Sequence, residues 1–267
     1  MSYPYGRAIL ITGASSGIGL AAARLFAQSG YHVFAASRRC EEGTQGNITS
    51  IRMDIRDEAS VLRARDMIAA RGGVGIVLNC AGISLAGAAE DTPEADLRAQ
   101  FETNYFGTLR VNRVFLPMLR ARGGGLVLVV GSVAGQIPLP YHCHYSGTKF
   151  ALDAYTQALR MEAGPFGVRA SLIQPGGTRT GLTGARQFAP PAGSPYTKAC
   201  AAAEASLARE EQTGAPAEQP ARVALRLAQQ KNPPVRATVG AGYKFLVASR
   251  RAMPDRLLEF MLQRKYR

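Results

Sequence analysis

Short apolar runs alternate with longer mixed segments along almost the whole chain. Seven runs have the length and composition of buried strands, near 8–12, 32–36, 48–53, 75–78, 125–131, 168–174 and 235–239. The segments between them predict helices at about 18–29, 57–71, 94–120, 146–163 and 217–230. Strands that alternate with helices indicate an α/β fold, in which a doubly wound, mostly parallel seven-stranded sheet has helices on both faces.

A glycine-rich turn directly follows the first predicted strand. The apolar run at 8–11 leads into Thr12-Gly13-Ala14-Ser15-Ser16-Gly17-Ile18-Gly19, and a helix rich in Ala and Leu comes next. A strand that turns through glycines into a helix N-terminus presents backbone N–H groups and the positive end of the helix dipole to an anion. Gly13 permits the tight turn, Gly17 lets a pyrophosphate approach the backbone, and Gly19 allows close helix–strand packing.

A tyrosine and a lysine stand four residues apart in Tyr145-Ser-Gly-Thr-Lys149, with Ser132 upstream. Residues at this spacing share one face of a helix. A tyrosine normally keeps its proton until about pH 10, and a fixed positive charge beside it favours the phenolate. The pair alone also fits an ordinary solvated helix face, so its meaning depends on the glycine turn.

Together these motifs resemble the short-chain dehydrogenase/reductase family in its compact, single-domain form. The glycine spacing is that family's Thr-Gly-x-x-x-Gly-x-Gly, and further landmarks occur in the family's order. These are Asn79-Cys80-Ala81-Gly82, Asn104, Gly131-Ser132 and Pro175-Gly176-Gly177-Thr178. Cys80 replaces the second Asn of the family's Asn-Asn-Ala-Gly.

The resemblance implies a three-layer Rossmann fold that forms one NAD(P)-binding domain over residues 1–267, with a substrate lid at about 183–220. It implies four catalytic residues. Tyr145 is the acid and base, and Ser132 fixes the substrate oxygen. Lys149 holds the nicotinamide ribose and lowers the pKa of Tyr145, and Asn104 holds a water that links Lys149 to solvent. No step requires a metal.

The end of the second predicted strand bears on the choice of cofactor. Ser37 stands where an acidic residue would bind the ribose 2′-hydroxyl of NAD, and Arg38 and Arg39 follow it. A guanidinium offers bidentate hydrogen bonds to a 2′-phosphate, so NADP(H) is preferred over NAD(H). The cofactor-binding residues are expected to be Gly13, Ser15, Ser16, Gly17, Ile18, Gly19, Ser37, Arg38, Arg39, Asp54, Asn79, Ala81, Gly82, Tyr145, Lys149, Pro175, Gly176 and Thr178.

The substrate is predicted from a narrower likeness. Segments such as Lys149-Phe150-Ala151-Leu152 and 164–168 look most like the 17β-hydroxysteroid and retinol dehydrogenase-like branch, which handles apolar alcohols, ketones and aldehydes. Ser132, His142 and Tyr145 are the expected substrate-binding residues, with lid contacts at Leu182, Phe188 and Tyr196. A 3-oxoacyl reductase that acts on an acyl carrier protein or thioester is the alternative enzyme.

The composition bears on the cellular location and on the role of the surface charge. The chain has 46% hydrophobic residues, four scattered cysteines and no apolar stretch long enough to cross a bilayer, and we expect a cytoplasmic protein. Its 32 basic and 19 acidic residues give a net charge of +13. The basic residues are dispersed, which favours a solvated surface over a nucleic-acid patch. By resemblance, the chain forms a homodimer or homotetramer through its long helices at about 98–120 and 146–163.

Two functions of other classes remain open. A regulator that senses NADP(H) without catalysis would need the glycine turn but no proton donor. A nucleic-acid binder would need a basic reading module, and the sequence contains none that we recognise.

Overall fold

A computed structural model describes residues 2–180, 190–250 and 252–266 of the chain. Its main sheet has eight strands in the order β10-β7-β6-β5-β1-β2-β4-β3. The strands are β1 (Ala8–Thr12), β2 (His32–Ser37), β3 (Gly43–Gln45), β4 (Ile48–Arg52), β5 (Ile76–Asn79), β6 (Gly125–Val130), β7 (Val168–Gln174) and β10 (Arg236–Thr238). The seven predicted strands are all present and run parallel, and β3 adds a short antiparallel edge beside β4.

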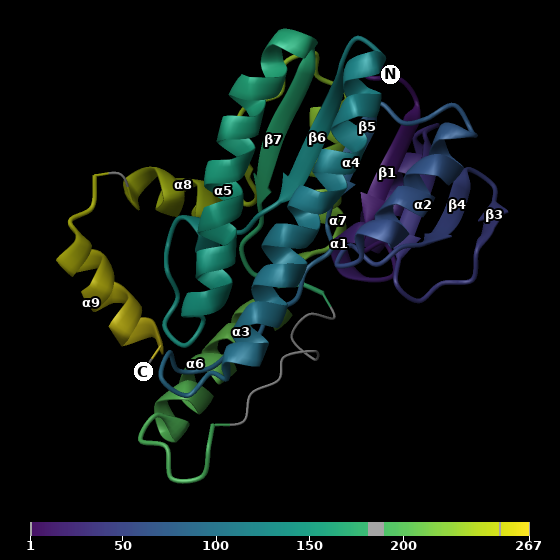
Figure 1. The fold of residues 1–267 in the computed structure, drawn as a ribbon. Coiled ribbons are helices and arrows are strands. Elements are labelled where there is room, and N and C mark those ends of the chain that lie inside the picture. Colours follow the sequence, from purple (N-terminus) through teal and green to yellow (C-terminus); the bar gives the residue numbers. More distant parts are fainter. Residues whose placement is uncertain (1, 181–189, 251, 267) are drawn as a thin grey trace.

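Helices cover both faces of this sheet (Figure 1). The helices of the described part are α1 (Gly17–Gln28), α2 (Glu58–Ala69), α3 (Glu94–Phe101), α4 (Gly107–Ala121), α5 (Cys143–Ala163), α6 (Thr197–Gln212), α7 (Glu218–Ala228), α8 (Ala241–Arg250) and α9 (Asp255–Tyr266). Of these, α2, α4 and α5 pack on one face of the sheet, and α1 and α7 pack on the other. No helix within the described ranges is both long enough and apolar enough to cross a membrane. The doubly wound Rossmann architecture predicted from the sequence is confirmed.

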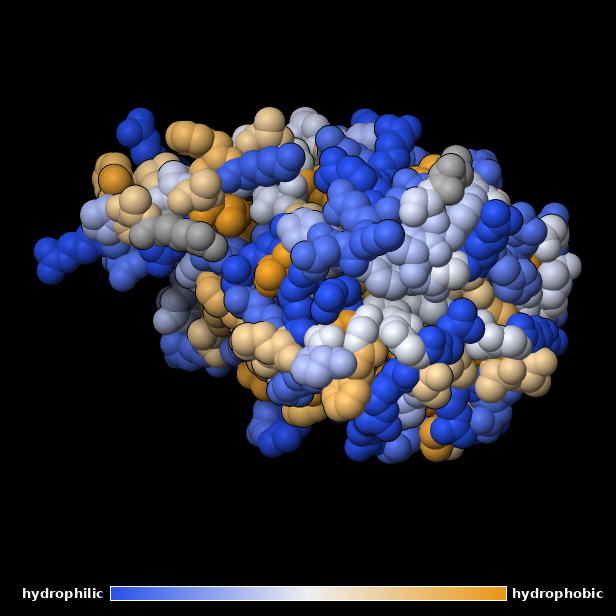
Figure 2. Space-filling view, turned by 90° about the horizontal axis from the view of Figure 1, so that it is seen from above, coloured by the Kyte–Doolittle hydropathy of each residue, from blue (hydrophilic) through white to orange (hydrophobic). Residues whose placement is uncertain are grey.

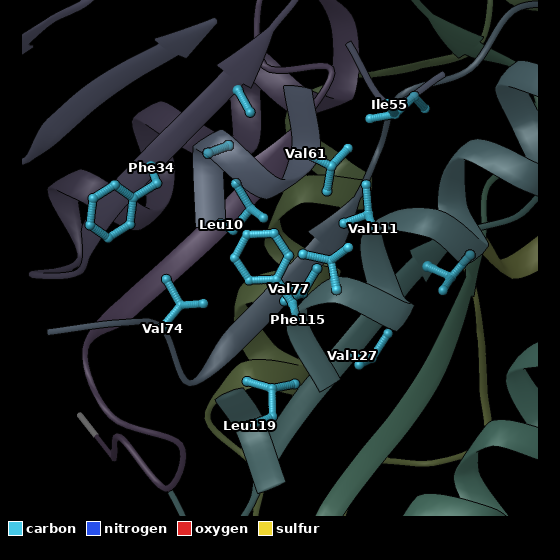
Figure 3. Packing of buried hydrophobic residues seen from close by; sticks show 14 of the residues in the cluster. Leu10, Phe34, Ile55, Val61, Val74, Val77, Val111, Phe115, Leu119 and Val127 are labelled. Atoms are coloured by element: carbon cyan, nitrogen blue, oxygen red, sulfur yellow. The ribbon is translucent and has the colours of Figure 1, made fainter. Parts of the chain in front are cut away.

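Alternate residues of each central strand feed two cores, because side chains of a strand point to opposite faces of the sheet. Leu10 of β1 packs with Val77, Val127 and the inner side chains of α2, α4 and α5, among them Phe115 (Figure 3). Its neighbours on β1 pack instead with α1 and α7 on the other face. Since both faces are covered, the central strands are apolar almost throughout, which is why they were recognisable in the sequence.

The long helix predicted at 94–120 is interrupted. A π-helical turn, η1 (Glu102–Phe106), separates α3 from α4, and Asn104 lies within it. Such a turn contains one residue more than an α-helical turn, so it changes the direction in which the following side chains point.

The C-terminal third departs most from the sequence pattern. Helix α6 lies within the predicted lid segment, and α8 and α9 follow the last strand without having been predicted. A second, two-stranded sheet of β8 (Thr178–Arg179) and β9 (Ala215–Pro216) joins the end of the β7 segment to the chain after α6. In Figure 1, α8 and α9 project from one side of the molecule.

Candidate active site

A cavity of about 420 Å³ lies beyond the carboxyl ends of the parallel strands. This is where open α/β sheets bind ligands. Every site residue predicted from the sequence lines it except Arg39, Asn79 and Asn104. The predicted lid contacts Leu182 and Phe188 lie outside the described residues. Tyr196 does not line the cavity, and its hydroxyl donates to Glu90 Oε2 at 2.8 Å.

The glycine turn forms one end of the cavity. Gly13 has a φ of +66°, and a Cβ placed there would lie 2.7 Å from Ala81 Cα. At Gly19 a Cβ would collide with the backbone of Gly13, so both positions must lack a side chain. Helix α1 begins at Gly17 with no side-chain cap from Ser16 and no acidic residue in its first turn. Its N-terminal N–H groups are therefore available to an anion, as a pyrophosphate site requires.

Thr12 connects the glycine turn to the segment that follows β5. Its Oγ1 accepts hydrogen bonds from the backbone N–H groups of Cys80 and Ala81, at 3.1 and 3.2 Å. The contact joins the ends of β1 and β5, two strands that lie side by side in the sheet. The first glycine turn and the Asn79–Gly82 segment thus form one continuous wall.

The end of the cavity beside β2 is positively charged. Ser37 and Arg38 line it, whereas Arg39 is exposed and is not a lining residue. Asp54 also lines it, and Arg56 holds both oxygens of its carboxylate at 2.7–3.2 Å, so the pKa of Asp54 is lowered. Arg56 is itself a lining residue that the sequence prediction missed, although it stands only two positions after Asp54.

Ser132, Tyr145 and Lys149 meet on another wall of the cavity. Ser132 follows β6, and its Oγ accepts a hydrogen bond from the N–H of Ala134 at 3.0 Å. Tyr145 and Lys149 are on α5, and Lys149 Nζ lies 5.5 Å from the centre of the Tyr145 ring. The predicted helical spacing therefore places the two side chains together.

Lys149 is almost completely buried, with 6% of its surface exposed. Its Nζ donates to the carbonyl oxygen of Val130 at 3.0 Å. Burial lowers the pKa of Lys149 from 10.5 to about 8, because the charged form loses its water, and the nearby Cys80 offsets part of this effect. Cys80 is partly exposed to the cavity, and desolvation of its thiol raises the pKa of this group to about 12, which keeps it neutral at physiological pH.

Two predicted asparagines hold the framework instead of lining the cavity. Asn104 Oδ1 accepts from Ile83 N at 2.8 Å, and its Nδ2 donates to Ile83 O and to Thr148. These bonds tie η1 to the segment after β5 and to α5. Asn79 Nδ2 donates to Asn112 Oδ1 at 2.9 Å, which joins the end of β5 to α4. Both side chains are buried.

The C-terminal helices supply a wall that sequence reasoning missed. Its residues from α6, α8 and α9 are Leu207, Glu210, Glu211, Tyr243, Leu246, Leu262, Lys265 and Tyr266. Tyr243 Oη accepts from Gly177 N at 2.9 Å and donates to Glu210 Oε1 at 2.6 Å, while Lys265 Nζ donates to Glu210 Oε2 at 2.6 Å. A Cβ at Gly176 would collide with the Tyr243 ring, so this glycine permits the contact.

Two buried polar side chains also line the cavity. His142, just before α5, is 2% exposed and lines the cavity. Ser84 is 3% exposed, and its hydroxyl has no hydrogen-bond partner among the described residues. A buried hydroxyl of this kind usually has a partner, so a ligand group is a fitting one.

These observations fit a bound dinucleotide. The side-chain-free turn and open helix end suit a pyrophosphate, and the guanidinium groups suit further phosphate. No group of three or more His, Cys, Asp or Glu side chains within the described part of the chain is arranged to hold a metal ion.

Known proteins with the same features identify the family. A sequence model described as short chain dehydrogenase matches residues 7–189. A 3-ketodihydrosphingosine reductase of Bacteroides thetaiotaomicron is 30% identical over 259 residues, which cover 96% of each chain. The 17-beta-hydroxysteroid dehydrogenase type 1 of Homo sapiens is 36% identical over 187 residues, 64% of this chain and 57% of that protein.

Solved structures agree with the sequence matches. A crystal structure of a short-chain dehydrogenase from Streptomyces avermitilis has a TM-score of 0.80 at 29% identity and covers 92% of both chains. A short chain dehydrogenase from Burkholderia cenocepacia, solved in complex with NADP, shares the fold with a TM-score of 0.76 at 23% identity. The chain belongs to the short-chain dehydrogenase/reductase family of oxidoreductases.

Proposed function

We propose that this protein is an NADP(H)-dependent oxidoreductase that interconverts an apolar alcohol and its ketone or aldehyde, of steroid-, retinol- or lipid-like structure. The observation that carries the proposal is the meeting of Ser132, Tyr145 and Lys149 on one cavity that the glycine turn also lines. A protein that only senses a nucleotide has no use for a buried lysine beside a tyrosine.

In the reductive direction the residues of this chain position the carbonyl and supply a proton. Ser132 Oγ donates a hydrogen bond to the carbonyl oxygen, and the Tyr145 hydroxyl transfers its proton to the same oxygen. The reduced nicotinamide, when bound, supplies the hydride to the carbonyl carbon. Lys149, protonated below about pH 8, stabilises the phenolate that remains. Oxidation of the alcohol uses the same groups in reverse.

By resemblance to the family, a water held by Asn104 would pass protons between Lys149 and solvent. The described bonds of the Asn104 side chain occupy its carbonyl and amide groups. We therefore propose two roles for Asn104. It holds a water in the relay, and its side chain fixes the segment at Ile83 and the helix that carries Lys149.

An apolar substrate is supported by the walls beside Tyr145. Ile137, Leu139, Leu207, Leu246 and Leu262 line the cavity and come from four separate segments of the chain. The Bacteroides relative, whose match covers 96% of each chain, is named a 3-ketodihydrosphingosine reductase. Steroid-like substrates are supported by the shorter match to the human enzyme.

Preference for NADP(H) is supported by the charge around Ser37. Arg38 and Arg56 line that end of the cavity, and the carboxylate of Asp54 is already bound by Arg56. The other acidic residues among the described lining, Glu210 and Glu211, belong to α6. A 2′-phosphate would meet a cationic environment there, and the guanidinium of Arg38 offers it a fork of donors.

The proposed chemistry is tested by Tyr145→Phe, with Tyr5→Phe as the matched control, because Tyr5 does not line the cavity and its hydroxyl donates to Lys231 O. We expect Tyr145→Phe to lose turnover by about three orders of magnitude or more while NADPH binding, measured by nucleotide fluorescence, stays within about twofold. Turnover near that of the control would refute the role of Tyr145. Equal loss of NADPH binding would show damage to the site as a whole.

We further propose that the whole chain is one domain and that the segment 183–220 acts as its lid. Leu207 and Glu210 of α6 line the cavity and support this reading. Limited proteolysis tests it, since NADPH with a substrate analogue should protect this segment. Equal cleavage with and without ligand would argue against a lid.

Self-association is proposed through α4 and α5. Four large apolar side chains stand exposed on or beside these helices, namely Phe106, Phe150, Met161 and Phe166. Light scattering after gel filtration should give two or four copies, and Met161→Glu should lower that number. A monomeric wild type would contradict the proposal. We also propose a cytoplasmic location, for which four free cysteines are suitable.

A further inference from the structure

Large apolar side chains are exposed on the two C-terminal helices. Of the nine large hydrophobic residues that stand exposed among the described residues, Phe245 is on α8 and Leu257, Phe260 and Met261 are on α9. Phe245 has 77% and Phe260 60% of its surface exposed. Single exposed apolar residues are ordinary, but several gathered on one structural unit mark an interaction site.

Helix α9 has two apolar faces. Leu258, Leu262 and Tyr266 form its inner face and pack against α8, α6 and the cavity wall. Leu257, Phe260 and Met261 are spaced i, i+3 and i+4, so they form a second stripe, which points to solvent. A surface helix normally needs only one apolar face, which is directed at its own core. None of the hydrophobic clusters formed by the described residues includes the outer stripe.

Basic residues outnumber acidic ones in the segment that contains these two helices. Residues 241–267 contain seven Lys or Arg and two Asp or Glu, a net charge of +5. Lys244, Arg256 and Arg264 are exposed and form no ion pair with the described residues. Arg264 continues the stripe one turn beyond Phe260. In Figure 2 the end of the molecule where α8 and α9 project shows orange apolar side chains between blue hydrophilic ones.

This arrangement favours one kind of partner. A second copy joined face to face would bring Lys244, Arg256 and Arg264 against the same three cations, and like charges across an interface are unfavourable. An anionic lipid bilayer satisfies both features, because its hydrocarbon region accepts the apolar side chains and its headgroups attract the cations.

We propose that the outer face of α8 and α9 is a docking surface for an anionic lipid bilayer. The chain would lie on the bilayer without crossing it, with Phe245, Leu257, Phe260 and Met261 inserted at the boundary between the headgroups and the acyl chains. The proposal does not depend on the reaction that the enzyme catalyses. Its consequence for the enzyme is structural, since the inner faces of the same helices supply Leu246 and Leu262 to the cavity.

Co-sedimentation with vesicles tests the docking surface without any turnover. The full-length protein is mixed with vesicles of phosphatidylcholine alone, or of phosphatidylcholine containing phosphatidylserine, at low and high salt. We expect binding to the phosphatidylserine vesicles only, weakened by salt because surface charges are screened. Absence of binding to the anionic vesicles would overturn the proposal.

Two pairs of variants test the residues. Arg256→Gln with Arg264→Gln should weaken vesicle binding about twenty- to thirtyfold, at roughly fivefold for each cation. Its control is Arg222→Gln with Arg226→Gln, two exposed arginines on α7 that also form no ion pair among the described residues. Equal weakening in the control would show a general effect of charge and overturn the proposal.

The apolar stripe is tested by Leu257→Ser with Phe260→Ser, which should weaken binding at least about tenfold. The control is Val235→Ser, an exposed apolar residue that lies outside α8 and α9 and outside the proposed self-association surface. NADPH affinity, measured for each variant, should stay unchanged and shows that the cavity is intact. Loss of an oligomer in the α9 variant, with vesicle binding retained, would overturn the proposal in favour of a second copy of the chain.

Discussion

Replacing Lys149 by Met should stabilise the ligand-free protein at neutral pH while it removes activity. Lys149 is a buried cation, and its lowered pKa of about 8 measures what burial costs the charged form. The fall from 10.5 corresponds to roughly 3 kcal/mol, at about 1.4 kcal/mol for each pKa unit. The lost hydrogen bond to Val130 O costs about 1 kcal/mol. Met has a similar length, so the net gain should be about 2 kcal/mol.

The gain in the free energy of unfolding from Lys149→Met should decrease as the pH rises. Below pH 8 the lysine is protonated in both the folded and the unfolded state. The free energy of unfolding of the wild type is then lowered by the full cost of burying the charge. Between about 8 and 10.5 the folded state has released the proton while the unfolded state keeps it. The unfolded state then binds more protons, so the stability of the wild type rises with pH in this window. The advantage of Lys149→Met should shrink over the same range.

Urea unfolding of wild type and Lys149→Met between pH 7 and pH 10.5 measures this difference. At pH 7 the variant should also melt about 5 °C higher, as expected for this free energy in a chain of this size. Lys198→Met is the control, because Lys198 is exposed on α6. A variant that is less stable than wild type at pH 7, or an advantage that stays constant with pH, would refute the reasoning.

Three further predictions concern binding and stability. Ser37→Asp should raise the KM for NADPH at least about tenfold and change the KM for NADH little, because a carboxylate repels the 2′-phosphate; equal effects on both would contradict this, and steady-state kinetics decides. Ser84→Ala should leave the free energy of unfolding unchanged within about 0.5 kcal/mol and raise the KM of a ligand about fivefold, since the hydroxyl has no partner among the described residues; an unchanged KM for cofactor and substrate would argue against a ligand contact. Tyr243→Phe should lower the free energy of unfolding by about 1–2 kcal/mol, measured in urea, because both Gly177 and Glu210 lose a partner; no change would mean that these bonds contribute little.

The parts of the site set by local sequence were predictable. Gly13 and Gly19 stand at positions where a side chain would collide with backbone, and this requirement is visible as a spacing of glycines. Tyr145 and Lys149 share a helical face, which follows from their separation by four residues. The apolar runs of the central strands predicted the sheet because both of its faces are covered.

The remaining parts depend on contacts between distant segments. Tyr243 donates a hydrogen bond to Glu210, which lies 33 positions earlier in the chain, and no local sequence pattern predicts this contact. The interruption at Asn104 is invisible in the sequence for a similar reason, since its side chain bonds Ile83 and Thr148 from other elements. Arg56 is a different case. Its closeness to Asp54 in the sequence was a usable signal, because a short turn brings such pairs together.

The most direct test of the central claim is oxidation of NADPH by the wild-type protein with a panel of apolar ketones and aldehydes. The panel should include long-chain keto bases, steroids and an acetoacetyl thioester, and NADH should be run in parallel. We predict turnover of apolar carbonyl compounds, with kcat/KM higher for NADPH than for NADH. Preference for the thioester, or tight NADPH binding with no turnover of any compound, would contradict the proposed function.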